Sequence, residues 1–178
     1  NMFMALATAR MAVTCGVGLN NAMASAINML GDVHGGAGEQ AIEFFHFVRA
    51  HDGTLSNAID AWQDERGKII PGYGHRFHTP TDPRSPRLMA LVDEATAGQI
   101  VDGAFRNTAL AVEGEMSTRR GKPLPMNIDG ATAVIYAELG FEPPLARGLF
   151  CLSRSVGILA HAWEQMQQGG RNKGPTPP

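Results

Sequence analysis

Apolar residues recur at steps of three and four along most of the chain. The clearest run lies in residues 145–163, where one stripe consists of Leu145, Leu149, Leu152, Val156, Leu159 and Trp163. Such steps place side chains on one face of an amphipathic α-helix, whereas a half-buried strand alternates every second residue. Convincing alternation is found in no segment. The pattern therefore predicts an all-α protein.

Other segments carry the same helical signal more briefly. A second stripe is formed by Val101, Phe105, Thr108, Val112 and Met116. Shorter helices are predicted at residues 3–14, 20–30, 37–50, 55–65, 86–97 and 130–139. Glycines, which commonly end helices, follow or separate these segments at Gly16, Gly31, Gly53, Gly98 and Gly140.

Residues 71–84, PGYGHRFHTPTDPR, interrupt this helical pattern. The segment holds three prolines, two glycines, two histidines and two arginines, which is more than a turn between helices requires. We therefore expect it to bind a ligand. His75 and His78 alone do not complete a metal site, and no carboxylate or thiol pattern supports one. The arginines are better suited to gripping a carboxylate or phosphate.

Two further segments combine a chemically useful side chain with the start of a helix. In LGDVHGGAGEQA, the glycines after His34 let backbone approach a bound molecule, and the following helix start favours negative charge. The alternative is a helix cap beside an incidental histidine. In KPLPMNIDGATA, Asp129 precedes a helix, and the alternative is that Asn127 or Asp129 is simply its N-cap.

Arg154 lies off the apolar stripe of the long helix, on a face shared with Arg147, Cys151 and Ile158. A helix with arginines among small apolar residues on its second face is expected to be enclosed. An enclosed guanidinium needs an anion, and a substrate carboxylate or a structural Asp or Glu would satisfy it equally well.

Composition narrows the class of protein. The 178 residues suffice for one domain or somewhat more, and the net charge of −2 without blocks of like charge argues against a nucleic-acid partner. The apolar opening contains Arg10 and small polar residues, so no membrane span is expected. Cys15 and Cys151 lack CxxC spacing, which favours a reducing, cytoplasmic location and no structural zinc. The start at Asn1 indicates a fragment or processed product.

Taken in order, these motifs resemble the citrate synthase superfamily, including its citryl-CoA lyase branch. They are His34 in HGGA, His75 in PGYGH, Arg84 in TDPR, Asp129 in NIDG and Arg154 in SRSVGILAH. The resemblance covers nearly the whole chain. It implies a helical homodimer whose active site lies in the cleft between a large and a small domain. Residues 1–35 and 126–178, with a C-terminal arm, would belong to the large domain and residues 36–125 to the small one. Family members also carry a further N-terminal segment.

The resemblance implies an enzyme that condenses acetyl-CoA with oxaloacetate through citryl-CoA to citrate and CoA, as in the tricarboxylic acid cycle. Asp129 would be the base, His34 would donate a hydrogen bond to the enolate oxygen, and His75 would polarise the ketone. Arg84 and Arg154 would bind substrate carboxylates. The alternatives are a citryl-CoA lyase, which cleaves citryl-CoA to acetyl-CoA and oxaloacetate, and a non-catalytic CoA-binding module.

The resemblance also implies where CoA binds, as a substrate rather than a resident cofactor. The backbone of Pro71, Gly72, Tyr73 and Gly74 would cradle its adenine end. Arg76 and Lys122 would meet its phosphates, although Lys122 can equally be a solvated surface lysine. Arg171, in the tail GGRNKGPTPP, would reach the active site of the other subunit, and the alternative is a disordered basic tail.

Overall fold

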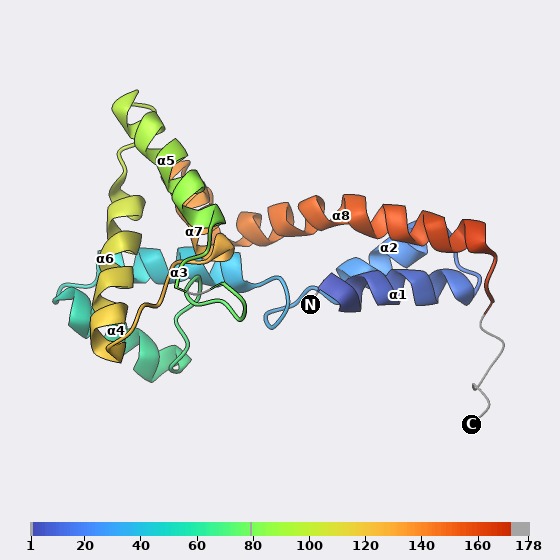
Figure 1. Cartoon of the computed structure of the whole chain (residues 1–178), viewed down its shortest axis with the longest axis horizontal. Coiled ribbons are helices and arrows are strands. Elements are labelled where there is room, and N and C mark those ends of the chain that lie inside the picture. The colour runs from blue at the N-terminus through green and yellow to red at the C-terminus, as the bar shows by residue number, and fades with distance from the viewer. Residues whose placement is uncertain (1, 79, 172–178) are drawn as a thin grey trace. The chain divides into compact units, whose positions relative to one another are not determined.

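The computed structural model describes residues 2–78 and 80–171, which form helices and no strands (Figure 1). The helices are α1 (Met2–Thr14), α2 (Leu19–Ile27), α3 (Ala37–Ala50), α4 (Leu55–Arg66), α5 (Arg84–Ala97), α6 (Ala104–Arg120), α7 (Ile128–Glu138) and α8 (Pro143–Gln168). The all-α prediction is confirmed. Each predicted helix is present, with ends displaced by a few residues, because the three-and-four spacing is a local property of the sequence.

The chain divides into two compact units. The central unit is Ala37–Arg147, and the terminal unit joins the described parts of Asn1–Gly36 and Gly148–Pro178. The central unit extends past residue 125, because α7 packs against α3, α5 and α6 within it. The predicted division at residues 35 and 125 concerns the domains of a whole enzyme and stays a prediction.

The central unit has a core of large side chains. Its fully buried members include Ile42, Phe44, Phe45, Ile59, Val112, Met126 and Val134. The ring of Phe44 meets Trp62 edge-on at 5.1 Å, and that of Phe45 meets Tyr73 at 6.4 Å. Burial of each such side chain contributes about 1.5–3 kcal/mol relative to exposure. This core fixes α3, α7 and the loop that contains Tyr73.

The terminal unit has a core of small side chains instead. Its buried residues are Ala5, Ala9, Val13, Ala22, Ala26, Ile158 and Ala162. Helix α1 runs beside α8 (Figure 1), and Arg10 links the two helices through Glu164 and through Gln168 Oε1 at 2.7 Å. Small residues allow helices to approach closely, but they bury little apolar area.

The predicted apolar stripe of α8 lies on the outside of this unit. Leu152 is 66% exposed, Val156 75% and Trp163 52%, while Ile158 and Ala162 face the core. An amphipathic stripe ordinarily meets a core, so these side chains form an apolar face without a partner inside the described chain.

Two further expectations concern membrane spans and the two cysteines. Across residues 2–78 and 80–171, every helix is either too short or too polar to cross a bilayer. Cys15 and Cys151 are free thiols.

Candidate active site

In the central unit, the loop at residues 72–75 is fastened to the segment that precedes α7. Gly74 N donates to Pro125 O at 2.7 Å, and Asn127 N donates to Gly72 O at 2.9 Å. The Asn127 side chain adds a third hydrogen bond, from Nδ2 to Gly74 O at 2.8 Å. These bonds hold His75, the next residue of the loop, beside the first turn of α7.

Two glycines make this close approach possible. A Cβ added to Gly130 would lie 2.3 Å from the carbonyl oxygen of Gly72, and one added to Gly72 would lie 2.8 Å from Gly130 Cα. Gly72 also has a φ of +85°, which other residues rarely adopt. Only glycine at both positions lets the loop rest directly on α7.

The start of α7 settles which side chain caps the helix. Asn127 Oδ1 accepts from Asp129 N at 2.9 Å and from Gly130 N at 3.1 Å, so Asn127 is the N-cap. Asp129 stands half-buried in the first turn of the helix. The cap that the sequence left open is therefore Asn127, and Asp129 does not have that task.

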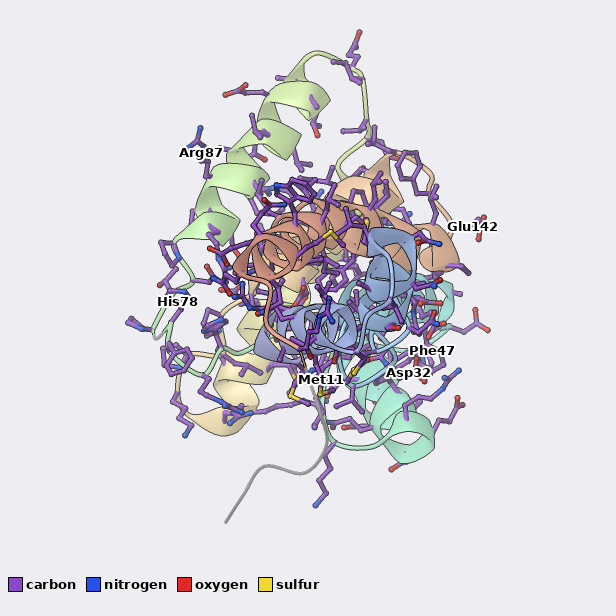
Figure 2. The ribbon with its side chains drawn as sticks, turned by 90° about the vertical axis from the view of Figure 1, so that its right-hand side faces the viewer. Met11, Asp32, Phe47, His78, Arg87 and Glu142 are labelled. Carbon is purple, nitrogen blue, oxygen red and sulfur yellow. The ribbon has the colours of Figure 1, made fainter. Side chains whose placement is uncertain are left out.

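Backbone hydrogen bonds fix the tautomer of the neutral His75 ring. Its Nδ1 accepts from Phe77 N and from His78 N, each at 3.0 Å. A ring nitrogen that accepts two N–H groups carries no proton, so the neutral ring has its proton on Nε2. The ring of His78, on the loop before α5 (Figure 2), lies 4.4 Å from that of His75. His75 thus presents an N–H donor.

Arg84 forms an ion pair with the fully buried Asp82, at 2.9 Å from Nε to Oδ1 and 2.7 Å from Nη2 to Oδ2. Hydrogen bonds from Arg84 hold the pKa of the Asp82 carboxyl well below its usual range. The same pair raises the pKa of Arg84, and the charge of Asp129 contributes. The central unit therefore gathers His75, Arg84 and Asp129.

A hollow of about 610 Å³ opens beside His75. It is lined by Tyr73, Gly74, His75, Pro80, Arg120, Lys122, Pro123, Leu124 and Pro125. Three of the residues predicted for CoA, Tyr73, Gly74 and Lys122, line this hollow, whereas Pro71, Gly72 and Arg76 do not. Sequence reasoning missed Arg120, although the basic run RRGK at residues 119–122 was a signal for it.

Tyr73 contributes backbone rather than phenol to this region. Its side chain is buried in the core, its hydroxyl donates to Ala109 O at 2.8 Å, and burial raises its pKa well above the usual value. The buried ring anchors the loop in the core. The backbone of Tyr73 can therefore face a ligand, as predicted for CoA, while its phenol does not.

The terminal unit holds His34 and Arg154, with Phe150 adjoining the turn after His34. A Cβ on Gly35, whose φ is +109°, would lie 3.0 Å from the ring of Phe150. The guanidinium carbon of Arg154 lies 4.6 Å from the centre of the same ring. Its buried Nε has no hydrogen-bond partner among the described residues, whereas Arg147 in the central unit is paired with Glu39. A buried donor without a protein partner is a candidate contact for an anionic ligand.

Arg171 lies past the end of α8, where it is exposed and lines a hollow of about 600 Å³ with Cys15 and Gly170. The residues that line this hollow include neither His34 nor Arg154. The rest of the predicted arm, residues 172–178, lies outside the described residues. The predicted contact with another subunit stays a prediction.

In the described part of the chain, no three His, Cys, Asp or Glu side chains are grouped so that they could hold a metal ion.

The family described as "Citrate synthase, C-terminal domain" matches residues 5–174. Citrate synthase 2 of Bacillus subtilis (strain 168) is 31% identical over 162 residues, which are 89% of this chain and 41% of that protein. Citryl-CoA lyase from Hydrogenobacter thermophilus has a TM-score of 0.78 at 28% identity, and the match covers 99% of this chain and 75% of that one.

A second solved structure is ATP citrate lyase from Methanothrix soehngenii in complex with citrate and coenzyme A, with a TM-score of 0.74 at 25% identity. That match covers 97% of this chain and 30% of the other. The chain spans between 36% and 42% of the length of several curated citrate synthases. Because the family match extends over nearly all of its residues, the chain belongs to the citrate synthase family.

Proposed function

We propose that the protein condenses acetyl-CoA with oxaloacetate through citryl-CoA to citrate and CoA. The observation that carries this proposal is the gathering of His75, Arg84 and Asp129 at the start of α7, beside a hollow lined by Arg120 and Lys122. Membership of the citrate synthase family supports it. So do the citrate and coenzyme A held by the related ATP citrate lyase.

The difficult step is removal of a proton from the methyl group of acetyl-CoA, because that carbon acid is far weaker than a carboxylic acid. Asp129 accepts this proton in the proposed mechanism. His34 donates a hydrogen bond to the enolate oxygen that forms, and one such preorganised donor is worth about 3–4 kcal/mol.

Oxaloacetate is activated by His75. The Nε2–H that its backbone hydrogen bonds enforce donates to the ketone oxygen, which makes the ketone carbon a better electrophile. Arg84 and Arg154 bind the two carboxylates, and the unpaired Nε of Arg154 supports this assignment.

In the proposed complex, CoA lies along the hollow beside His75. Arg120 and Lys122 meet its phosphates, and Arg76 stands exposed on the neighbouring loop. The backbone of Pro71, Gly72, Tyr73 and Gly74 receives the adenine. No resident cofactor or metal takes part.

Citryl-CoA lyase activity is the second candidate. It is supported by the structural likeness to citryl-CoA lyase from Hydrogenobacter thermophilus, with a TM-score of 0.78 at 28% identity. Both activities use the same side chains, because a catalyst accelerates a reaction in both directions.

The test supplies purified protein with acetyl-CoA and oxaloacetate, and separately with citryl-CoA, while free CoA, citrate and acetyl-CoA are measured. Citrate and CoA from the first mixture would establish the synthase. Acetyl-CoA from citryl-CoA without citrate formation would establish the lyase. CoA binding without turnover in either mixture would leave a binding module.

We further propose that the protein is a cytoplasmic homodimer in which Arg171 contributes to the partner's active site. The exposed apolar face of α8 supports assembly, and the free thiols support the location. Subunits carrying Arg171→Ala are mixed with subunits carrying Asp129→Asn. A contact across the dimer regenerates one intact site per heterodimer, so the mixture gains activity over both parents. A mixture no more active than its parents would exclude the shared site.

A further inference from the structure

Asp82 is a charged side chain with no exposure to solvent. In the described part of the chain, it is the only buried side chain that carries a charge. Burial of a carboxylate is costly unless hydrogen bonds and an opposite charge compensate for the lost water. The surroundings of Asp82 must therefore supply both.

Four donors surround the Asp82 carboxylate. Oδ1 accepts from Arg84 N at 3.1 Å and from Arg84 Nε at 2.9 Å. Oδ2 accepts from Arg84 Nη2 at 2.7 Å and from Ile128 N at 3.2 Å. The two oxygens thus join Arg84, the first residue of α5, to Ile128, the first residue of α7.

The contact with Arg84 uses only one edge of the guanidinium. Nε–H and one N–H of Nη2 face Asp82, which leaves both N–H groups of Nη1 and the second N–H of Nη2. These remaining donors form the end-on fork that matches a carboxylate. The side chain of Arg84 is 44% exposed, so this fork is accessible.

The contact with α7 completes the cap of that helix. Asn127 accepts the N–H groups of Asp129 and Gly130, and Asp82 accepts that of Ile128, directly before the base. Ser85 adds a hydrogen bond from Oγ to Met126 O at 2.7 Å. The start of α5 and the turn around Asp129 are therefore fixed to one another.

We propose that Asp82 is a positioning residue, whose buried carboxylate aims the free fork of Arg84 at a substrate carboxylate and sets its place relative to Asp129. The inference rests on the proposed function, because it assigns the oxaloacetate carboxylate to Arg84. Asp82 itself touches no substrate.

The test is Asp82→Asn, which keeps the shape but removes the charge and offers one acceptor where Arg84 and Ile128 need two. Oxaloacetate binding is measured by calorimetry, and kcat and KM are measured by CoA release. We expect the Kd for oxaloacetate to rise about tenfold to a hundredfold, with a fall in kcat. The matched control is Asp60→Asn, since Asp60 also pairs with an arginine, Arg119, but on the surface. It should change either quantity by less than about twofold.

A double substitution separates positioning from general stabilisation. If Asp82 acts through Arg84, adding Asp82→Asn to Arg84→Ala causes no further loss of oxaloacetate affinity. Independent losses that multiply, or an unchanged Kd in Asp82→Asn, would overturn the inference. Oxaloacetate binding without turnover in the unmodified protein would refute the proposed reaction, yet the binding comparison would still decide the role of Asp82. Absence of both binding and turnover would overturn both proposals.

A further test uses the unmodified protein and therefore does not require that the Asp82→Asn variant folds. The Arg84 Nε–H resonance is assigned in ¹⁵N-resolved NMR spectra by its loss in Arg84→Lys. On addition of oxaloacetate, we expect this proton to stay protected by Asp82 while the Nη signals shift. Rapid exchange of the Nε proton in the complex would mean that Arg84 leaves Asp82 to bind substrate, which would contradict the proposal.

Discussion

The two units of the chain differ in how completely they bury their apolar side chains. The central unit buries large side chains such as Phe44, Phe45 and Ile59 within itself. The terminal unit buries mostly alanines and leaves Leu152, Val156 and Trp163 of α8 exposed. A unit with a complete core can hold a polar loop rigidly, because the helices under that loop have fixed positions. A unit with an open apolar face is stabilised further when another surface covers it.

The largest effect is expected at Asp129, the proposed base in the central unit. Asp129→Asn keeps the shape of the side chain but cannot accept the methyl proton, so kcat should fall by about 100-fold to 10,000-fold. Oxaloacetate affinity, measured by calorimetry, should remain largely intact. Asp64→Asn, an exposed position on α4, serves as the control. Activity within tenfold of the unmodified protein would remove Asp129 from the base role.

The next effect tests how tightly the loop is packed on α7. Gly130→Ala places a methyl group 2.3 Å from Gly72 O and should lower the free energy of unfolding by about 3 kcal/mol. Gly114→Ala is the matched control, since nothing lies within 4 Å of an added Cβ in α6. It should stabilise the protein by about 0.5–1 kcal/mol. Denaturant unfolding measures both, and equal behaviour of the two variants would show that the loop moves off α7 easily.

The exposed face of α8 gives a smaller effect, on assembly. Leu152→Glu combined with Val156→Glu should weaken self-association about tenfold to a hundredfold, because two charges would be buried at the contact. Unfolding of the single chain should change by less than about 0.5 kcal/mol. Sedimentation velocity measures the mass, and Leu91→Glu, an exposed leucine of α5, is the control. A dimer of unchanged affinity would place the interface elsewhere.

The smallest effect is the pH dependence of stability at Asp82. Its pKa is lowered in the folded state, so its stabilisation is complete above the usual pKa of about 3.9 and is lost as the pH falls through the folded value. The difference in unfolding free energy between the unmodified protein and Asp82→Asn should therefore shrink from pH 5 to about pH 2. Arg84 is partly exposed to water, which keeps this difference small. A difference that grows on acidification would contradict this assignment.

Helix positions could be predicted from the sequence because their spacing is written in neighbouring residues. Spacing does not say which face meets a core, and so the stripe from Leu145 to Trp163 identified α8 but not its exposure. The motifs likewise identified the family, while the functional roles of His34, His75 and Asp129 stay predictions.

Contacts between residues far apart in the chain could not be predicted from the sequence. Asp82 stands in the predicted TDPR motif, yet nothing in that motif shows that its carboxylate reaches Ile128 N. Likewise, nothing in the NIDG motif shows that Asn127 Nδ2 reaches the carbonyl oxygen of Gly74. Such contacts depend on tertiary packing, which local patterns do not contain.

The Asn127 side chain makes three hydrogen bonds, two that cap α7 and one that holds Gly74 of the loop. Loss of its amide group would therefore affect the loop without affecting the cap. Deamidation on ageing would replace Nδ2 with a second oxygen. An aspartate caps a helix as well as an asparagine does, so α7 would keep its first turn. The oxygen that replaced Nδ2 would face Gly74 O without a proton between them, and the loop next to His75 would be released. Old protein would then keep its helical circular dichroism while its ability to hold that loop declined.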